Sequence, residues 1–332
     1  MAYQNVGTPR FYINYFNYWI QSGLGLTGST LPGDGDGTKA INLISMNPAS
    51  VQGFDFGGNS GYWGFRINSP YTSVEQFDLN YMAVLGHNLN SANASSYPNG
   101  SDGSNPDEFT EKTEIVNWEN SVTSLPLNGW SLMEFTGLTN DLGFLYPGFI
   151  IHDTNGGGFN DIVRIGAVSI GRYYEMPHSP DLSLSMSHEY DGIKKIQTKG
   201  GSTLSNANFH KPPKWGDLEA WQLGTWQQLS SGRRSWDLSF TYISDTDIEP
   251  RNYTGLKTDG EINDDNWFQN VLYYTMGGHL PFIFQPDKDA TYDSATYTVP
   301  EFAICRFDMN SFKRTQISFK TYNIKVKIVE SW

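Results

Sequence analysis

LSLSMSHEY (182–190), SWDLSFTY (235–242) and YNIKVKI (322–328) decide the fold class, because apolar and polar residues alternate along each stretch. Successive side chains of a β-strand point to opposite faces of a sheet, so a period of two predicts strands with one buried face. The residues predicted to point inward are Leu182, Leu184, Met186, His188, Tyr190, Trp236, Leu238, Phe240, Tyr242, Tyr322, Ile324, Val326 and Ile328. Lys325 and Lys327 are predicted to point outward. The pattern is typical of half-buried antiparallel strands.

The last part of the chain, residues 177–332, is therefore predicted to form a β domain, with one packed helix over 264–276. The helix lies within NDDNWFQNVLYYTMGG (263–278), where apolar residues recur at helical spacing. Its signals are an N-cap at Asp264 or Asn263, an apolar face made by Trp267, Val271 and Tyr274, and an end at Gly277.

Residues 40–176 are broken into short apolar runs by Asn, Gly, Ser and Pro, which predicts a β-sandwich or jelly roll. Strand-length runs bounded by turn residues are INLIS (41–45), YWGFRI (62–67), YMAVLG (81–86) and DIVRIGAVSIG (161–171). The segment 90–111 has almost no apolar residue and is predicted to be a long surface loop.

Residues 1–39 are an aromatic segment followed by an acidic, glycine-rich loop. At a period of 3.6 residues Tyr12, Tyr15, Phe16 and Trp19 share a face, whereas at a period of two Phe11, Ile13 and Tyr15 do, so helix and strand are both open. GDGDG (33–37) is predicted to be a turn or loop. A helix-loop-helix calcium site fails because Ser45 stands where the twelfth position needs a carboxylate, while a looser calcium site is an alternative to an ordinary acidic loop.

The composition excludes several classes of protein. The 332 residues carry a net charge of −13, which argues against a protein that binds nucleic acid mainly through its phosphates. Cys305 is the single cysteine, which excludes a disulfide-stapled scaffold, and it is expected to be a small buried residue of a strand. Aromatic residues make up 15% of the chain, which favours a compact β-rich protein. No segment resembles an export signal or a membrane helix.

No constellation of residues points to catalysis, so no catalytic, cofactor-binding or metal-binding residue is predicted. His188 is expected to be a satisfied core histidine, and His87 to be a turn or packing residue first and a ligand-binding residue second. A basic stretch is predicted either to contact an acidic neighbouring subunit or to form a solvated face. It comprises Lys194, Lys195, Lys199, Lys211, Lys214, Arg233 and Arg234.

Several segments resemble virion proteins of tailed bacteriophages. YMAVLGHNL (81–89) is similar to the galactose-binding-like (discoidin-type) jelly rolls of phage tail proteins, and residues 148–204 resemble the end of that domain and the start of the next. The other segments that carry the resemblance are KPPKWGDLEAWQL (211–223), SGRRSWDLSFTYISD (231–245), GGHLPFIFQPD (277–287), FAICRFDM (302–309) and the final IVESW (328–332). Over about residues 40–332 they resemble tail or minor structural proteins of phages that infect cyanobacteria and other marine bacteria.

The resemblance implies a galactose-binding-like jelly roll over 40–176 and a tail-ring-like β domain over 177–332. It implies an architectural protein of the virion tail, a ring or adaptor of the tail or baseplate of the distal-tail type, made in the host cytoplasm. Its partners would be copies of itself in a homo-oligomeric ring and other tail or baseplate proteins, with no nucleic acid and no membrane insertion. Distal tail proteins usually place the ring domain before or around the appended domain, whereas here the jelly roll comes first.

Two other functions stay open from the sequence. One is a carbohydrate-binding module that recognises host glycans through the loops after His87 and around Asn155. The other is a capsid cement or decoration protein. An enzyme is not expected.

Overall fold

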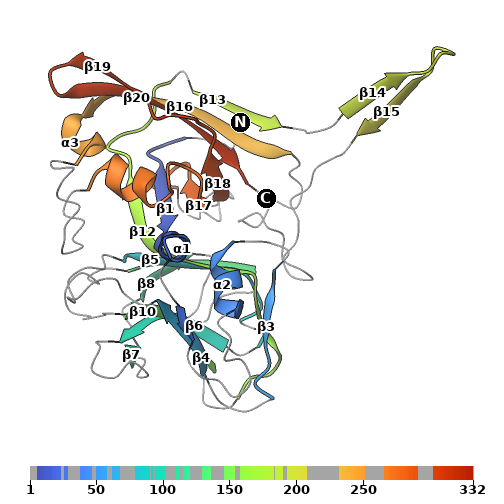
Figure 1. Ribbon diagram of the computed structural model, residues 1–332, viewed down its shortest axis with the longest axis vertical. Coiled ribbons are helices and arrows are strands. Elements are labelled where there is room, and N and C mark those ends of the chain that lie inside the picture. The colour runs from blue at the N-terminus through green and yellow to red at the C-terminus, as the bar shows by residue number, and fades with distance from the viewer. Residues whose placement is uncertain are drawn as a thin grey trace.

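An antiparallel sheet of eleven strands runs through the described residues, which are mainly β (Figure 1). The computed structural model describes residues 6–23, 26–28, 38–46, 50–57, 62–67, 79–89, 91–92, 94–101, 110–111, 115–119, 129–135, 146–153, 158–182, 184–189, 193–207, 232–250, 265–290 and 302–331. In spatial order the strands are β13 (Ser185–Glu189), β16 (Arg233–Ser244), β20 (Thr321–Glu330), β18 (Ala303–Phe307), β17 (Phe282–Gln285), β1 (Arg10–Asn14), β12 (Ala167–Glu175), β5 (Tyr81–His87), β9 (Gly129–Phe135) and β8 (Ile115–Glu119), with β19 (Arg314–Ser318) paired to β20.

A second antiparallel sheet of five strands packs against one end of the large sheet. Its order is β2 (Leu26–Gly28), β4 (Tyr62–Ile67), β10 (Tyr146–Asp153), β6 (Ala94–Ser101) and β7 (Thr110–Glu111). Phe65 and Phe149 from this sheet share a buried cluster with Met82 and Val168 from the large sheet. The lower half of Figure 1 is therefore a structure of two packed β layers.

Two strand pairs and four short helices complete the described structure. The pairs are β3 (Gln52–Phe54) with β11 (Val163–Ile165), and β14 (Ile193–Gln197) with β15 (Thr203–Ala207). The helices are α1 (Tyr15–Gln21), α2 (Thr38–Ile44), α3 (Asp245–Ile248) and the π-helix η4 (Phe268–Tyr273). Both α1 and α2 contact β12.

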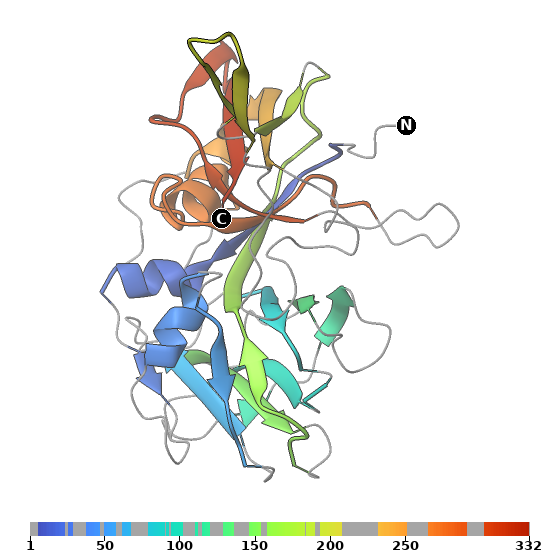
Figure 2. The ribbon, with the colours of Figure 1, turned by 90° about the vertical axis from the view of Figure 1, so that its right-hand side faces the viewer.

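The N-terminal strand β1 lies in the middle of the large sheet, between β17 and β12 (Figure 2). Arg10 stands opposite Gln285 on one side and Glu175 on the other. A Cβ added at Gly171 of β12 would lie 1.9 Å from the carbonyl oxygen of Ile13, so glycine is what lets β1 approach this closely. Strand β1 thus joins the strands of residues 40–176 to those of residues 177–332, and the sheet continues across the boundary predicted near residue 176.

A change of secondary structure at Asn14 explains why the N-terminal segment fits two periods. Strand β1 ends there, and Asn14 Oδ1 accepts a hydrogen bond of 3.2 Å from the backbone N–H of Asn17, which makes it the N-cap of α1. Tyr15 and Phe16 are then buried by the helix, whereas Tyr12 lies in a separate cluster on the other face of the sheet. Strand and helix are both present, one after the other.

Aromatic side chains connect the core from one end of the molecule to the other. Phe11 of β1 packs edge-on against Trp267, with ring centroids 4.9 Å apart, and lies 5.3 Å from Phe284. Phe16 of α1 lies 6.0 Å from Phe65 in the five-stranded sheet. Each such pair stabilises the fold by about 0.5–1.5 kcal/mol beyond the contribution of the apolar area that it buries. The aromatic residues of this buried cluster therefore come from both halves of the chain.

The structure confirms several of the predicted strands. Ile324, Val326 and Ile328 are buried on β20, and Lys325 is exposed. The runs 62–67 and 81–86 form β4 and β5, and the run 161–171 contributes β11 and the first half of β12. On β16, Trp236, Leu238 and Phe240 are buried as predicted.

The last residue of the predicted inward face of β16, Tyr242, points outward instead. A β-bulge lies between Phe240 and Ile243, because these two residues pair with Ile324 and Tyr322, so three steps on β16 match two on β20. Tyr242 has a φ of 62° and is 76% exposed, while Ile243 takes the buried position. A bulge reverses the alternation beyond it, which a regular period of two does not predict.

The prediction for LSLSMSHEY is wrong at its ends. Leu184 and Met186 are half-buried and pack against the core, but Leu182 and His188 are exposed. Strand β13 is the edge of the large sheet and pairs with β16 alone among the described residues. Since an edge strand is covered on fewer sides, its alternation does not bring every second side chain into the core. His188 is therefore not a core histidine. Tyr190 lies outside the described residues.

INLIS (41–45) is a helix and not a strand. Ala40, Leu43 and Ile44 are buried on α2, and Ile41 is about half exposed. Residues three and four apart share one face of a helix, so the buried set fits a helical period once Ala40 is included. The run of five residues was too short to separate the two periods.

The segment 90–111, predicted as a loop, contains the strand β6. All eight residues of β6 pair with β10, from Ala94 opposite Asp153 to Ser101 opposite Tyr146, and β7 adds a short pairing with β6. The strand is rich in Ser, Asn, Gly and Pro, which have low strand propensity. Pairing with the apolar strand β10 outweighs that propensity, so the prediction of a loop through this whole segment is wrong.

The helix predicted over 264–276 is shorter and of a different type. The π-helix η4 covers Phe268–Tyr273, and the predicted face of Trp267, Val271 and Tyr274 is buried. The predicted N-caps, residues 263 and 264, lie outside the described residues. Within them, Asn266 acts as a cap, since its Oδ1 accepts a hydrogen bond of 2.9 Å from the backbone N–H of Gln269.

Candidate functional site

His87 is a packing residue inside the core. Its side chain is fully buried, its Nδ1 accepts a hydrogen bond of 3.3 Å from the backbone N–H of Leu89, and its Nε2 lies 3.0 Å from Ser131 Oγ. Because Nδ1 accepts, Nε2 carries the proton and donates to the hydroxyl. Burial lowers the pKa of His87 to about 3, so the ring is neutral. The prediction that His87 is a packing residue is confirmed. Because the ring is fully buried, a sugar bound by the loop after His87 would contact other side chains.

Cys305 is a buried thiol, and Asp245 and Asp247 lie in a short helix. Cys305 is buried in β18, as predicted, and burial followed by the charge of Glu330 raises the pKa of its thiol. Asp245 and Asp247 belong to the first turn of α3. Residues 33–37, the GDGDG loop, and Asn155 lie outside the described residues. Among the residues that the structure describes, no group of three or more His, Cys, Asp or Glu could hold a metal ion.

Arg234 is part of a buried ion pair and not of a basic surface. Its Nη2 donates a hydrogen bond of 2.9 Å to Glu330 Oε1, its Nε one of 3.1 Å to Glu330 Oε2, and its Nη2 a further one of 3.2 Å to the carbonyl oxygen of Phe302. Both charged side chains are almost fully buried. The prediction that the basic stretch contacts a neighbouring subunit is therefore wrong for Arg234, whose charge is satisfied within its own chain.

A polar network on one face of the large sheet fixes β1 to its neighbours. Arg10 forms ion pairs with Glu134 of β9 and Glu175 of β12, and Tyr12 Oη lies 2.8 Å from Glu134 Oε1 and 2.9 Å from Gln285 Oε1. Burial opposes the charge of Arg10, but Tyr12 and the two carboxylates more than offset this and raise its pKa. Burial and the charge of Glu134 raise the pKa of Tyr12, so the phenol stays protonated. Every charge of the network has a partner within it, which suits a structural role.

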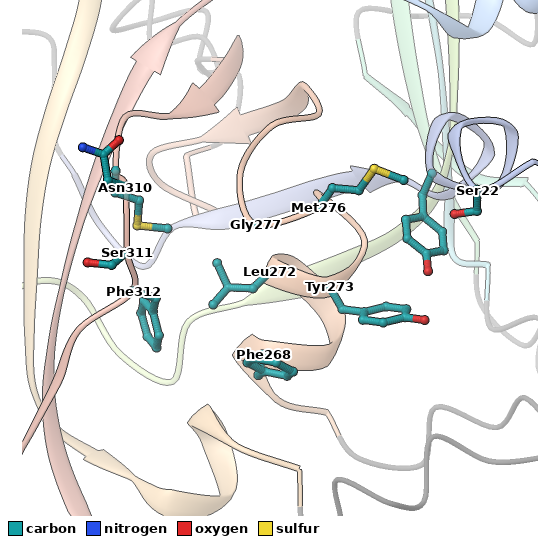
Figure 3. A pocket seen from close by; sticks show the side chains of 11 residues that line it. Ser22, Phe268, Leu272, Tyr273, Met276, Gly277, Asn310, Ser311 and Phe312 are labelled. Atoms are coloured by element: carbon teal, nitrogen blue, oxygen red, sulfur yellow. The ribbon is translucent and has the colours of Figure 1, made fainter.

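A groove of about 560 Å³ lies against η4 (Figure 3). Its lining comes from α1 and its C-cap (Tyr18, Ser22), from η4 and the turn after it (Phe268, Leu272, Tyr273, Met276, Gly277), and from the loop between β18 and β19 (Met309, Asn310, Ser311, Phe312). None of these residues is charged. Methionine and aromatic side chains make an adaptable apolar surface, and the few amides and hydroxyls lie among them. Such a lining suits an apolar group, and none of these residues carries a carboxylate, imidazole, thiol or ammonium group.

The turn after η4 shapes one wall of this groove. Gly277 donates a backbone hydrogen bond of 2.7 Å to the carbonyl of Leu272, and Met276 donates one of 3.1 Å to Tyr273, which is the pattern of a Schellman motif. Met276, with a φ of 52°, occupies the left-handed position that glycine usually takes. The predicted end of the helix at Gly277 is thus one residue late. The turn places the Met276 side chain, 38% exposed, at the groove.

The hairpin of β14 and β15, here called the arm, projects from the rest of the molecule (Figure 1). Ile196 and Leu204 stand opposite each other on its two strands and are 63% and 59% exposed. Gly201, with a φ of 83°, closes the turn and donates a backbone hydrogen bond of 2.9 Å to Thr198. A two-stranded hairpin is only marginally stable by itself. An exposed apolar pair on such a hairpin therefore indicates that another surface covers it.

Sequence reasoning did not identify the groove or the arm as sites. The arm carries a signal that could have found it, because IKKIQ (193–197) and TLSNA (203–207) flank a Gly-Gly turn. The groove carries none, since its lining comes from three segments far apart in the chain. Only the fold brings them together.

No helix among the described residues is long and apolar enough to cross a membrane. No protein-family model, curated protein or solved structure matches this chain.

Proposed function

We propose that this protein is a structural component of a bacteriophage virion, a ring or adaptor of the tail or baseplate that acts through protein–protein contacts and performs no reaction. The phage assignment rests on the sequence resemblance. The architectural role is supported by the described polar clusters, which are satisfied within the fold, and by the apolar surface left open on the arm. Its proposed partners are copies of itself and neighbouring tail or baseplate proteins.

The finer fold assignment belongs to the same proposal. A galactose-binding-like jelly roll over residues 40–176 is supported by the five-stranded sheet packed against β12, β5, β9 and β8. A tail-ring-like domain over 177–332 is supported by the strands β16, β20, β18 and β17 with η4 beside them. The position of β1 between the two sets of strands means that neither set has a complete sheet without the N-terminal segment.

The observation that carries the proposal is the arm with its exposed Ile196 and Leu204 pair. Enzymes and small-ligand receptors concentrate function in a concave site, whereas an apolar feature that projects from the body can be covered only by another surface. A protein that forms a ring or an adaptor needs such features, because each subunit must bury part of its surface on the next one.

Immunogold labelling of intact virus particles tests the location, and light scattering with negative-stain microscopy of the purified protein tests assembly. We expect label on the tail and particles larger than one chain. Label on the capsid would instead favour a cement or decoration protein. A protein that stays monomeric at high concentration and labels no virion structure would contradict the proposal.

A further inference from the structure

The charge of the arm determines which surfaces it can bind. Residues 193–207 contain Lys194, Lys195 and Lys199 and no acidic residue. Since the whole chain carries −13 and the arm +3, the rest of the chain carries −16. Two arms packed face to face would bring six positive charges together, which is unfavourable, whereas an arm is attracted to the body of another copy. A two-fold contact between arms is therefore disfavoured, and an arm-to-body contact is favoured.

The arm cannot place its apolar pair on its own groove. Only residues 190–192 connect β13 to β14, and the four residue steps from Glu189 to Ile193 span at most about 14 Å, so the base of the arm stays near the end of β13. Figure 1 shows the arm on the right of the molecule and the orange turns of η4 on the left. Any contact between the two features must then join two different copies of the chain.

The groove has the chemistry that the apolar pair of the arm requires. Leu272 of η4 faces Phe312 across the groove, whereas Met276, in the turn after η4, lies on the side of Ser22 (Figure 3). Phe268 of η4 and Met309 add further apolar surface to the lining. Its volume of about 560 Å³ leaves space for side chains of another molecule. Because no lining residue carries a charge, Ile196 and Leu204 can enter without leaving a buried ion unpaired, and the lysines of the arm can stay in water.

We propose that the arm of one copy docks in the η4 groove of a second copy, with Ile196 and Leu204 against Leu272, Met276 and Phe312. This inference rests on the proposed assembly function, and it identifies the η4 groove as the surface that receives the arm. The contact joins two different patches, so it is heterologous, and repetition of it closes a ring or extends a filament.

The test measures the mass of the full-length protein by light scattering for two interface variants. Ile196→Asp removes the apolar pair from the arm, and Asn310→Arg places a positive charge in the groove, where it would repel the arm. Each variant should dissociate to monomers or bind its neighbour at least about tenfold more weakly, because a charge enters an apolar contact. Asn310 is exposed, so this variant should keep its fold, which circular dichroism checks. The matched control is Ile41→Asp, at an exposed apolar position on α2, which should assemble as the wild type does.

Mixing the two variants gives the decisive result. Ile196→Asp keeps an intact groove, and Asn310→Arg keeps an intact arm, so a heterologous contact predicts a heterodimer from two proteins that are each monomeric. If Asn310→Arg assembles like the wild type, or if the mixture forms no heterodimer, the groove is not the receptor, even though the wild type still assembles. A wild type that is itself monomeric would overturn the proposed self-assembly as well, so the two failures are distinguishable.

Discussion

Three buried polar residues of this fold, His87, Arg234 and Glu330, are held by partners within the chain, which makes their removal measurable. His87 is neutral and bonded on both ring nitrogens, and Arg234 and Glu330 neutralise each other inside the sheet. Burial of a polar group is unfavourable unless its hydrogen bonds are made, so substitution of these residues should change the free energy of unfolding.

The burial of His87 predicts a loss of stability in mild acid. Its pKa is about 3 in the folded protein and near 6.5 in the unfolded chain, so between these values the unfolded chain binds the extra proton. The free energy of unfolding should fall by about 2 kcal/mol from this group alone between pH 7.5 and pH 5. Urea titrations at both pH values measure it, with His87→Gln as the control. The variant should be less stable at pH 7.5 but lose about 2 kcal/mol less on acidification, and an equal loss in both proteins would contradict the assignment.

The Arg234–Glu330 pair predicts a large coupling between two substitutions. Glu330→Leu leaves the buried guanidinium of Arg234 without the charge of Glu330 and should lower the free energy of unfolding by about 3–5 kcal/mol. Replacing both residues, as Arg234→Met with Glu330→Leu, removes both charges and should recover most of that loss. Recovery stays incomplete because the backbone N–H of Arg234, which bonds to Glu330 Oε2 at 3.0 Å, loses its acceptor. Chemical denaturation of Arg234→Met, Glu330→Leu and the double variant completes the cycle, and additive losses would refute the pairing.

At the scale of elements, the sequence predicted side-chain periods well and backbone irregularities poorly. The buried faces of β16 and β20 were predicted correctly up to the bulge, because the alternation of apolar and polar residues is visible in the sequence. The bulge at Tyr242, the helix α2 and the polar strand β6 were missed. Each depends on what the segment packs against, and a partner strand or a covering layer is not visible in a window of five to ten residues.

The bulge in β16 predicts a stabilising substitution at an unusual place. Tyr242 has a φ of 62°, a region that disfavours side chains with a Cβ by about 1–2 kcal/mol, and it is mostly exposed, so it contributes little burial. Tyr242→Gly should raise the free energy of unfolding by about 0.5–1 kcal/mol, after allowing for the flexibility of glycine in the unfolded chain. Lys325→Gly on β20 is the control, at an exposed position of a regular strand, and should lower it by about 0.5–1 kcal/mol. If thermal melting shows both glycines to be destabilising, the bulge does not strain Tyr242.

At the scale of the whole molecule, strand β1 joins the two halves of the chain, because it pairs with β12 and with β17. A division of the sequence into successive segments assigns β1 to neither half. Sequence reasoning treated residues 1–39 as a separate segment, because pairing between residues 10–14 and residues 167–175 or 282–285 leaves no local signal. The arm and the groove could not be identified from the sequence for the same reason. Only their positions in the folded chain show that one projects and that the other is lined by three distant segments.

The central position of β1 predicts that residues 40–176 do not fold without the N-terminal segment. Without it, β12 loses the partner on one edge, and the core loses Phe11, Ile13, Phe16 and Trp19, all almost fully buried. At about 1.5–3 kcal/mol for each side chain, the loss is of the order of the whole stability of a domain. A fragment of residues 1–176 restores β1 and α1 and should melt cooperatively, whereas the 40–176 fragment should show no cooperative transition by near-ultraviolet circular dichroism. Equal melting of the two fragments would show that residue 40 begins an independent domain and that β1 only covers its edge.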